Sequence, residues 1–148
     1  MQVLAVVGPS DSGKTTVVAR LAERLAARGP VATVKHLTHE PDIDTEGKDT
    51  ARHRAGGASR TIGLTDDGSW FGTGDSRDLS AVLGSFAPTH DYALVEGFSD
   101  SALPKVVLGG RDAAAPVAVT AASADALDLD AAVAAITDPA AAYEPHGQ

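Results

Sequence analysis

The stretch that decides the fold is Gly8-Pro9-Ser10-Asp11-Ser12-Gly13-Lys14-Thr15, which matches the phosphate-binding pattern G-x-x-x-x-G-K-[ST]. The run Val3-Leu4-Ala5-Val6-Val7 before it is short, apolar and rich in β-branched residues, as expected of a buried parallel strand. After it, residues 16–26 place apolar and charged side chains on opposite faces of a helix. Strand, glycine loop and helix therefore follow one another in the order that a phosphate-binding P-loop requires.

Two glycines give this loop its chemistry. Gly8 and Gly13 reach backbone angles that other residues avoid, so the chain can close tightly around an oxygen-rich ligand. Backbone N–H groups at the start of the helix then point at the anion, and the helix dipole adds to the attraction. Lys14 is predicted to be a catalytic contact to the β- and γ-phosphates, and the Thr15 hydroxyl to bind Mg²⁺. The predicted nucleotide-binding loop comprises Gly8, Ser10, Asp11, Ser12, Gly13, Lys14 and Thr15.

Composition limits the classes of partner. A chain of 148 residues fits one domain, residues 1–148, with a sizeable core. Its net charge of −8 disfavours nucleic acids and anionic membranes, because both select basic surfaces. The chain has no cysteine, and its N-terminal apolar run is too short for a signal peptide or a membrane span. We therefore expect a cytoplasmic protein that binds neither nucleic acid nor membrane, with a loose tail over about 139–148.

The remaining segments alternate between strand and helix signals. Gly29-Pro30 ends the first helix, and residues 31–34 are expected to form a strand that carries Lys35 and His36 to its carboxyl end, where open α/β sheets bind ligands. Further strands are expected at 59–64, 104–109 and 116–120, with a short edge strand at Trp70-Phe71 and helices beginning at Asp75 or Ser76 and at Asp128 or Asp130. This order predicts an α/β fold, a mostly parallel twisted sheet of the P-loop NTPase type with helices on both faces.

The segment from Lys35 to Thr50 is the least generic part of the sequence. It is polar and is expected to begin as a loop and to continue as a helix from about Lys48 to Ala55. Histidines and carboxylates gather here, which in isolation would indicate a solvated acidic loop. After a P-loop and a second strand, the same segment instead indicates one that senses Mg²⁺ and the γ-phosphate. A zinc or nickel site is a third alternative, although His36 and His39 are not spaced for one helix face.

The second informative motif is Asp91-Tyr92-Ala93-Leu94-Val95-Glu96-Gly97-Phe98. A buried apolar strand that ends in a carboxylate is the Walker-B arrangement, in which the acid holds Mg²⁺ directly or through water. Glu96 occupies that position and is predicted to be the second catalytic residue and a metal ligand together with Thr15. Gly97 is expected to bring a backbone N–H near the γ-phosphate.

Taken together, these segments resemble the molybdopterin-guanine dinucleotide biosynthesis protein B family (MobB). The resemblance covers most of the chain and rests on the P-loop, Val34-Lys35-His36 with His39 and Asp42-Ile43-Asp44, Gly47-Lys48-Asp49-Thr50 with Arg52-His53-Arg54-Ala55-Gly56, Leu94-Val95-Glu96-Gly97-Phe98, and Pro104-Lys105. The middle block, from Val34 to Gly56, is the part that is specific to this family. Departures are Thr38 and Glu40, where the family's histidine-rich stretch has histidine and glycine, and Thr50 in place of serine.

The resemblance implies a GTP-binding protein with weak GTPase activity, usually a homodimer. Using GTP and Mg²⁺, it would assist the partner guanylyltransferase that attaches GMP to molybdopterin, giving the guanine dinucleotide form of the molybdenum cofactor. Matching positions make Thr16 a further phosphate contact, and Asp49 a water-mediated Mg²⁺ contact. A second anionic ligand, such as a pterin phosphate or the partner's nucleotide, is expected on Lys35, His36, His39, Lys48, Arg52 and Arg54.

The residues themselves leave the base and the reaction open. The chain contains no asparagine, so the guanine-reading sequence N-K-x-D is absent, and any base contact must come from backbone or from an aspartate between Thr120 and Asp130. One alternative is a P-loop small-molecule kinase with Asp49 or Asp44 as its base. Another is a metallochaperone GTPase that uses His36, His39 and Glu40.

Overall fold

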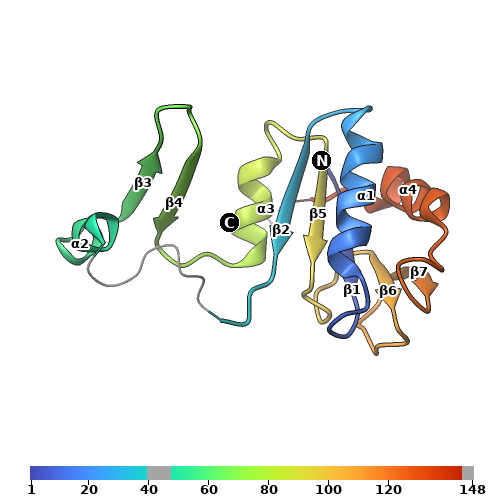
Figure 1. Ribbon diagram of the computed structural model, residues 1–148. Coiled ribbons are helices and arrows are strands. Elements are labelled where there is room, and N and C mark those ends of the chain that lie inside the picture. Colours follow the sequence, from blue (N-terminus) through green and yellow to red (C-terminus); the bar gives the residue numbers. More distant parts are fainter. Residues whose placement is uncertain (40–47, 145–148) are drawn as a thin grey trace. The chain divides into compact units, whose positions relative to one another are not determined.

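The computed structural model describes residues 1–39 and 48–144 (Figure 1). The predictions for Glu40 and Asp44 therefore lie outside the described residues, as does the segment from Asp42 to Gly47. The chain divides into two compact units. The larger unit comprises Met1–His36 and Leu79–Gln148, and the smaller comprises Leu37–Asp78. The prediction of a single domain stays a prediction, and each unit is described by itself.

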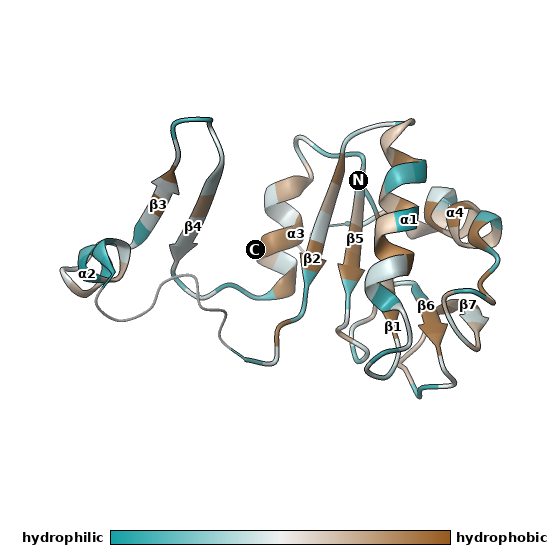
Figure 2. Ribbon diagram, viewed as in Figure 1, coloured by the Kyte–Doolittle hydropathy of each residue, from teal (hydrophilic) through white to brown (hydrophobic). Residues whose placement is uncertain are grey.

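The larger unit is built on a five-stranded sheet in the order β2-β5-β1-β6-β7. Every pair of neighbouring strands is parallel. The strands β1, β5 and β6 in the middle are buried on both faces, which explains why their sequences are apolar almost throughout. The apolar colouring is visible on β6 in Figure 2. Their bounds are β1 Gln2–Val7, β2 Val31–Lys35, β5 Tyr92–Glu96, β6 Lys105–Leu108 and β7 Val117–Ala121.

Helices cover both faces of this sheet. Helix α1 (Lys14–Ala26) and helix α4 (Leu129–Thr137) pack on one face, where Leu21 and Ile136 join Leu4 and Leu94 in one apolar core. Helix α3 (Leu79–Phe86) covers the other face, where Leu83 packs with Val3, Val95 and their neighbours. The α/β fold with helices on both faces is therefore confirmed. Helix α3 begins at Leu79, so neither Asp75 nor Ser76 caps it.

Two features of the larger unit differ from a simple reading of the sequence. Lys105 begins β6 yet is fully buried, and its ammonium group donates to the backbone oxygens of Ser101 and, at 2.7 Å, Leu103. The expected loose tail is ordered as far as residue 144: Pro139–Ala141 form a 3₁₀ helix and Ala142 pairs with Gln2. Pro139, Pro145 and Gly147 indicated a loose tail, and the contact with β1 was not foreseen because β1 lies at the opposite end of the sequence.

The smaller unit contains helix α2 (Asp49–Ala55) and strands β3 (Arg60–Leu64) and β4 (Trp70–Gly74). The two strands form an antiparallel hairpin that is a separate two-stranded sheet. The expectation that Trp70-Phe71 forms an edge strand is therefore wrong for the main sheet, because β4 pairs with β3 alone in the described chain. A turn at 65–69 joins them, held by Thr65 N–H donating to Ser69 O at 2.8 Å.

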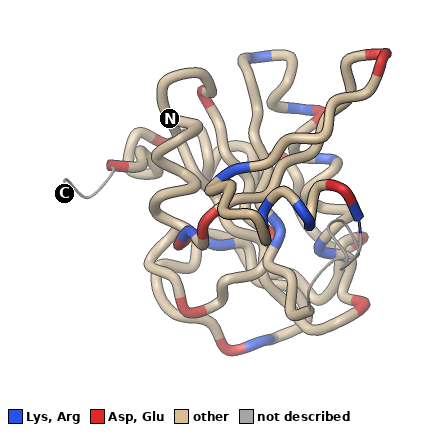
Figure 3. The backbone as a smooth tube through the Cα atoms, turned by 90° about the vertical axis from the view of Figure 1, so that its left-hand side faces the viewer, with Lys and Arg blue, Asp and Glu red and all other residues tan. Residues whose placement is uncertain are grey.

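Charged residues of both signs are interspersed along the described chain (Figure 3). Over these residues no helix is both long and apolar enough to cross a membrane.

Candidate nucleotide-binding site

The parallel sheet brings three chain segments to one edge. Because β2, β5 and β1 run the same way, the segments after Lys35, Glu96 and Val7 leave the sheet at its carboxyl end. The register pairs Glu96 with Val6 on one side and with Lys35 on the other. The P-loop, the predicted Walker-B acid Glu96 and the segment that begins at Lys35 therefore meet at this edge of the sheet, as the sequence predicted.

The P-loop has the backbone geometry that its glycines suggested. Gly13 lies in the left-handed region at φ 88°, and Asp11 shares that region at φ 61°. A Cβ on Gly13 would stand 2.5 Å from the Cβ of Ala124, and a Cβ on Gly8 would stand 2.6 Å from Ser12 Oγ. Neither position can hold a larger residue without displacing the loop, so both glycines are required for its shape.

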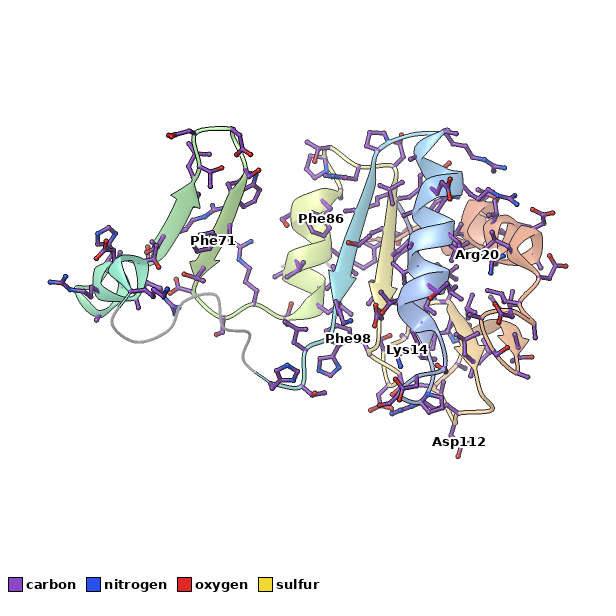
Figure 4. The ribbon with its side chains drawn as sticks, in the orientation of Figure 1. Lys14, Arg20, Phe71, Phe86, Phe98 and Asp112 are labelled. Carbon is purple, nitrogen blue, oxygen red and sulfur yellow. The ribbon has the colours of Figure 1, made fainter. Side chains whose placement is uncertain are left out.

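The start of α1 is arranged to receive an anion. Its N-cap residue, Gly13, provides no side-chain cap, so the first amide groups of α1 have no such partner. Ser12 Oγ is buried and has no hydrogen-bond partner in the described part of the chain. Lys14, labelled at the start of α1 in Figure 4, donates from Nζ to Pro9 O at 2.6 Å and so lies over the loop. These groups fit a phosphate chain, which accepts hydrogen bonds through all its oxygens.

Thr15 and Glu96 form the centre of the site. The Thr15 hydroxyl lies 3.0 Å from each carboxylate oxygen of Glu96, although 81 positions separate the two residues in the sequence. Glu96 is 8% exposed, and Lys35 Nζ lies 3.2 Å from its Oε1. A hydroxyl and a carboxylate in contact are the oxygen ligands that Mg²⁺ takes in P-loop proteins, so these residues fit the ion.

Gly97 differs from its predicted role. Its backbone N–H donates to Val6 O at 2.9 Å, continuing the strand ladder, and is not directed at a phosphate. Gly97 instead adopts φ 96° and makes room for His36, whose Cβ would lie 2.7 Å from a Cβ on Gly97. His36 then stacks on Phe98, with ring centroids 4.4 Å apart (Phe98 is labelled in Figure 4). The turns after β2 and β5 are thus joined by an aromatic pair that the sequence did not reveal.

A further segment lies against the P-loop. Ala124, in the loop between β7 and α4, is buried against Gly13. Arg20 of α1 donates to the backbone oxygen of Ala124 at 3.1 Å (Arg20 is labelled in Figure 4). The sequence located a possible base contact only broadly, between Thr120 and Asp130. The structure brings the middle of that range to the nucleotide loop.

The other predicted site residues divide between the two units. Ser10, Asp11, Thr15 and Thr16 are exposed around the P-loop, and Lys35 and His36 belong to the larger unit with them. In the smaller unit, Asp49 lies 3.9 Å from Arg52 in a solvent-exposed ion pair. The residues of the smaller unit that were predicted to bind a second ligand or metal are all exposed: His39, Lys48, Asp49, Arg52 and Arg54. Over residues 1–39 and 48–144, no three histidine or carboxylate side chains gather as a metal cluster.

This sheet order, with a glycine loop leading into α1 and a hydroxyl–carboxylate pair at the carboxyl edge, defines a fold of the P-loop NTPase type. Within that class the chain belongs to the MobB family: residues 3–135 match the family described as molybdopterin guanine dinucleotide synthesis protein B.

Individual relatives agree with this assignment. The chain is 43% identical over 146 residues to a protein of Haloferax volcanii named probable molybdopterin synthase, covering 99% of this chain but 49% of that protein. It is 35% identical to the molybdopterin-guanine dinucleotide biosynthesis adapter protein of Haemophilus influenzae, covering 77% of this chain and 66% of the relative. This chain thus spans about half to two thirds of these relatives.

Solved structures share the fold. A crystal structure of Bacillus subtilis MobB is 37% identical, with a TM-score of 0.56, and the match covers 72% of this chain and 67% of that one. A MobB homologue from Bacillus stearothermophilus is 31% identical, with a TM-score of 0.53 over 72% of this chain and 63% of that one.

Proposed function

We propose that this protein binds GTP with Mg²⁺ and acts as an adaptor in the attachment of GMP to molybdopterin, hydrolysing GTP only slowly. The observation that carries nucleotide binding is the contact between the Thr15 hydroxyl and Glu96 at 3.0 Å, beside an uncapped helix start. Membership in the MobB family supports the role in making the guanine dinucleotide cofactor. The partner is then the guanylyltransferase, and the expected location is the cytoplasm.

The residues of the P-loop would hold the phosphates, and Thr15 and Glu96 would hold Mg²⁺. When bound, the ion neutralises phosphate charge. Lys14 lies beside Pro9 O and can contact a phosphate by a short movement of its flexible side chain. Slow hydrolysis is expected because no glutamine of the described larger unit lies beside the P-loop to orient water; Gln2 is the one described glutamine, and its amide donates to Asp138 O.

Guanine preference is the finer part of this proposal, and Asp125 is its best-supported residue. Three aspartates follow β7 before and at the start of α4. Asp128 caps α4 by accepting from the N–H groups of Asp130 and Ala131, and Asp130 pairs with Arg24 at 2.8 Å. Asp125 is exposed, follows Ala124, and has no such partner in the described chain. A carboxylate can accept from both the N1–H and the 2-amino group of guanine, whereas adenine has no proton on N1 and no amino group at position 2.

A competition titration tests this function. GTP and ATP are titrated with Mg²⁺ against the unmodified protein and against Lys14→Ala, with circular dichroism as the folding control. A guanine preference of tenfold or more, about 1.4 kcal/mol, together with loss of triphosphate binding in Lys14→Ala, is expected. Equal affinity or ATP preference would remove the guanine proposal and favour the kinase alternative. Unchanged affinity in a folded Lys14→Ala variant would contradict the site itself.

We also propose that the active form is a homodimer joined through the outer edges of the β3–β4 hairpin. In the described chain these two strands pair only with each other, so the outer edge of each is not covered by a further strand. A two-stranded sheet is marginally stable by itself and gains from further pairing. Light scattering coupled to size-exclusion chromatography is expected to give twice the mass of the 148-residue chain, and a monomer at every concentration would contradict the proposal.

A further inference from the structure

The smaller unit contains a hollow that none of the roles above uses. It has a volume of about 500 Å³ and is lined by residues of β3, of β4 and of the segment after β4. The lining residues that matter to the argument are Arg60, Trp70, Gly72, Gly74, Asp75 and Arg77. All belong to the unit Leu37–Asp78.

Two glycines form the floor of this hollow. Directly opposed residues of an antiparallel pair project from the same face, and the register opposes Arg60 to Gly74, Ile62 to Gly72, and Leu64 to Trp70. One face of the hairpin therefore carries side chains on β3 but two bare positions on β4. A Cβ added to Gly72 would meet Ile62 and the backbone oxygen of Thr61 at 3.5 Å and Trp70 at 3.8 Å, all at ordinary van der Waals distances. Glycine inside a strand often marks close approach of a ligand, and here the strand geometry itself does not require it.

Trp70 closes one end of the hollow. It is 68% exposed although it is the sole tryptophan of the chain, and its ring edge borders the space above Gly72. A large aromatic side chain left in solvent on a flat surface is a platform on which a planar ring can stack. Ile62, opposite Gly72, is 52% exposed and offers further apolar surface.

The other end of the hollow is charged. Arg60 and Arg77 line it, and neither is paired with a carboxylate in the described chain. Asp75 also lines it, so the three charged side chains leave one net positive charge. Ser59 and Ser76 add hydroxyl groups that can donate to an anion. Two planar guanidinium groups beside hydroxyl donors suit the oxygens of a phosphate monoester.

We propose that this hollow binds a flat heteroaromatic compound that carries a phosphate monoester, with the ring on Trp70 and the phosphate on Arg60 and Arg77. Trp70 opposes Leu64, four residues from Arg60, so the two ends are about 13 Å apart along the strand. Because the arginine side chain is long, its guanidinium group can lie closer to Trp70 than its backbone does. The remaining distance matches the length of a nucleoside monophosphate. The site does not involve the P-loop residues, so this proposal can be tested independently of the proposed GTP binding.

The test uses the full chain and the emission of Trp70, which reports on this hollow because no other tryptophan is present. GMP, guanosine and inorganic phosphate are titrated separately, in the unmodified protein and in Lys14→Ala, which disables the P-loop. GMP is expected to change the emission saturably and equally in both proteins. Guanosine and inorganic phosphate are each expected to bind at least tenfold more weakly, because each lacks one half of the recognition.

Three variants sharpen the test. Gly72→Val keeps a residue suited to a strand and meets no atom closer than 3.5 Å at its Cβ, but its side chain fills the hollow, so GMP binding should fall below detection. Arg60→Gln and Arg77→Gln should each weaken GMP about tenfold without changing guanosine. Arg28→Gln, an exposed arginine after α1, is the matched control and should change neither.

Several outcomes would overturn the proposal. Equal affinity for GMP and guanosine would show that no phosphate is recognised, and loss of the signal in Lys14→Ala would assign the binding to the P-loop. Unaltered binding in Gly72→Val would place the ligand elsewhere. An emission change that follows protein concentration but not GMP would show that a second copy of the chain covers this face.

Discussion

The ammonium group of Lys35 lies 3.2 Å from Glu96 Oε1, an oxygen that also lies 3.0 Å from the Thr15 hydroxyl. The pairing follows from strand register, since Lys35 and Glu96 are direct neighbours at the ends of β2 and β5. Glu96 is 8% exposed, so a cation beside it offsets the cost of burying its charge. Lys35 therefore stabilises the charge of Glu96, the predicted metal ligand. This role does not depend on whether Lys35 also contacts the predicted second anionic ligand.

The first prediction measures this pair. A double-mutant cycle with Lys35→Gln and Glu96→Gln should give a coupling of about 1 kcal/mol in urea unfolding, because the Lys35 side chain is 54% exposed and solvent screens the pair. The cycle on Arg24 and Asp130, whose side chains are 54% and 83% exposed, should give ~0.5 kcal/mol or less. A coupling no larger than that of the exposed pair would mean that Glu96 does not need Lys35.

The second prediction concerns Thr15. Thr15→Val removes the hydroxyl but keeps the shape of the side chain, so triphosphate affinity in the presence of Mg²⁺ should fall about tenfold. Thr15→Ser keeps the hydroxyl and should retain most of the affinity. Titration in EDTA is the control, because without the ion the three proteins should bind alike. If Thr15→Val loses as much triphosphate affinity in EDTA as it does with Mg²⁺, Thr15 contacts phosphate and not the ion.

The third prediction tests base recognition. Asp125→Ala should reduce the preference for GTP over ATP to less than threefold while leaving ATP affinity unchanged, because the lost carboxylate would contact only the base. Asp66→Ala, in the exposed turn of the hairpin, is the matched control. The readout is competition against a fluorescent nucleotide. A variant that loses GTP and ATP affinity to the same degree would assign Asp125 to the loop's structure instead.

The contacts within the larger unit show which parts of the fold a sequence can reveal. The P-loop and the strand ending in Glu96 were predictable because each is local, and a parallel sheet necessarily brings the carboxyl ends of such strands to one edge. The ion pair of Lys35 was not predictable, because it depends on β2 lying beside β5, and periodicity does not give strand order. The hairpin was mistaken for sheet strands for the same reason, since a strand signal does not name its partner.

The burial of Lys105 could not be predicted from the sequence, because lysine is ordinarily an exposed residue. The fourth prediction concerns this residue. Burial lowers the pKa of its ammonium group, and the nearby carboxylate of Asp100 opposes part of that shift. Between the lowered pKa and the ordinary value of 10.5, the unfolded chain binds more protons than the folded one, so this group makes stability rise with pH in that window. Lys105→Met should abolish the rise, measured by urea unfolding at pH values approaching 10.5. An identical pH profile in the variant would contradict it.

The fifth prediction separates crowding from backbone strain at Gly97. Gly97 and Gly110 both have positive φ, at 96° and 65°, so alanine at either should cost about 1 kcal/mol from the left-handed conformation. A Cβ on Gly110 would meet nothing within 4 Å, whereas a Cβ on Gly97 would stand 2.7 Å from the Cβ of His36. Gly97→Ala should therefore cost about 1–3 kcal/mol more than Gly110→Ala in urea unfolding.

The spectroscopic consequence distinguishes this explanation from a general loss of stability. The stacking of His36 on Phe98, at 4.4 Å between ring centroids, should shift the proton resonances of His36 through the ring current of Phe98. Gly97→Ala pushes His36 away and should move those resonances toward their unstacked positions, while Gly110→Ala should leave them unchanged. If the two variants lose equal stability and the His36 resonances are unaltered, the turn after Glu96 accommodates the added methyl group without displacing His36. Gly97 would then be required only for its positive φ.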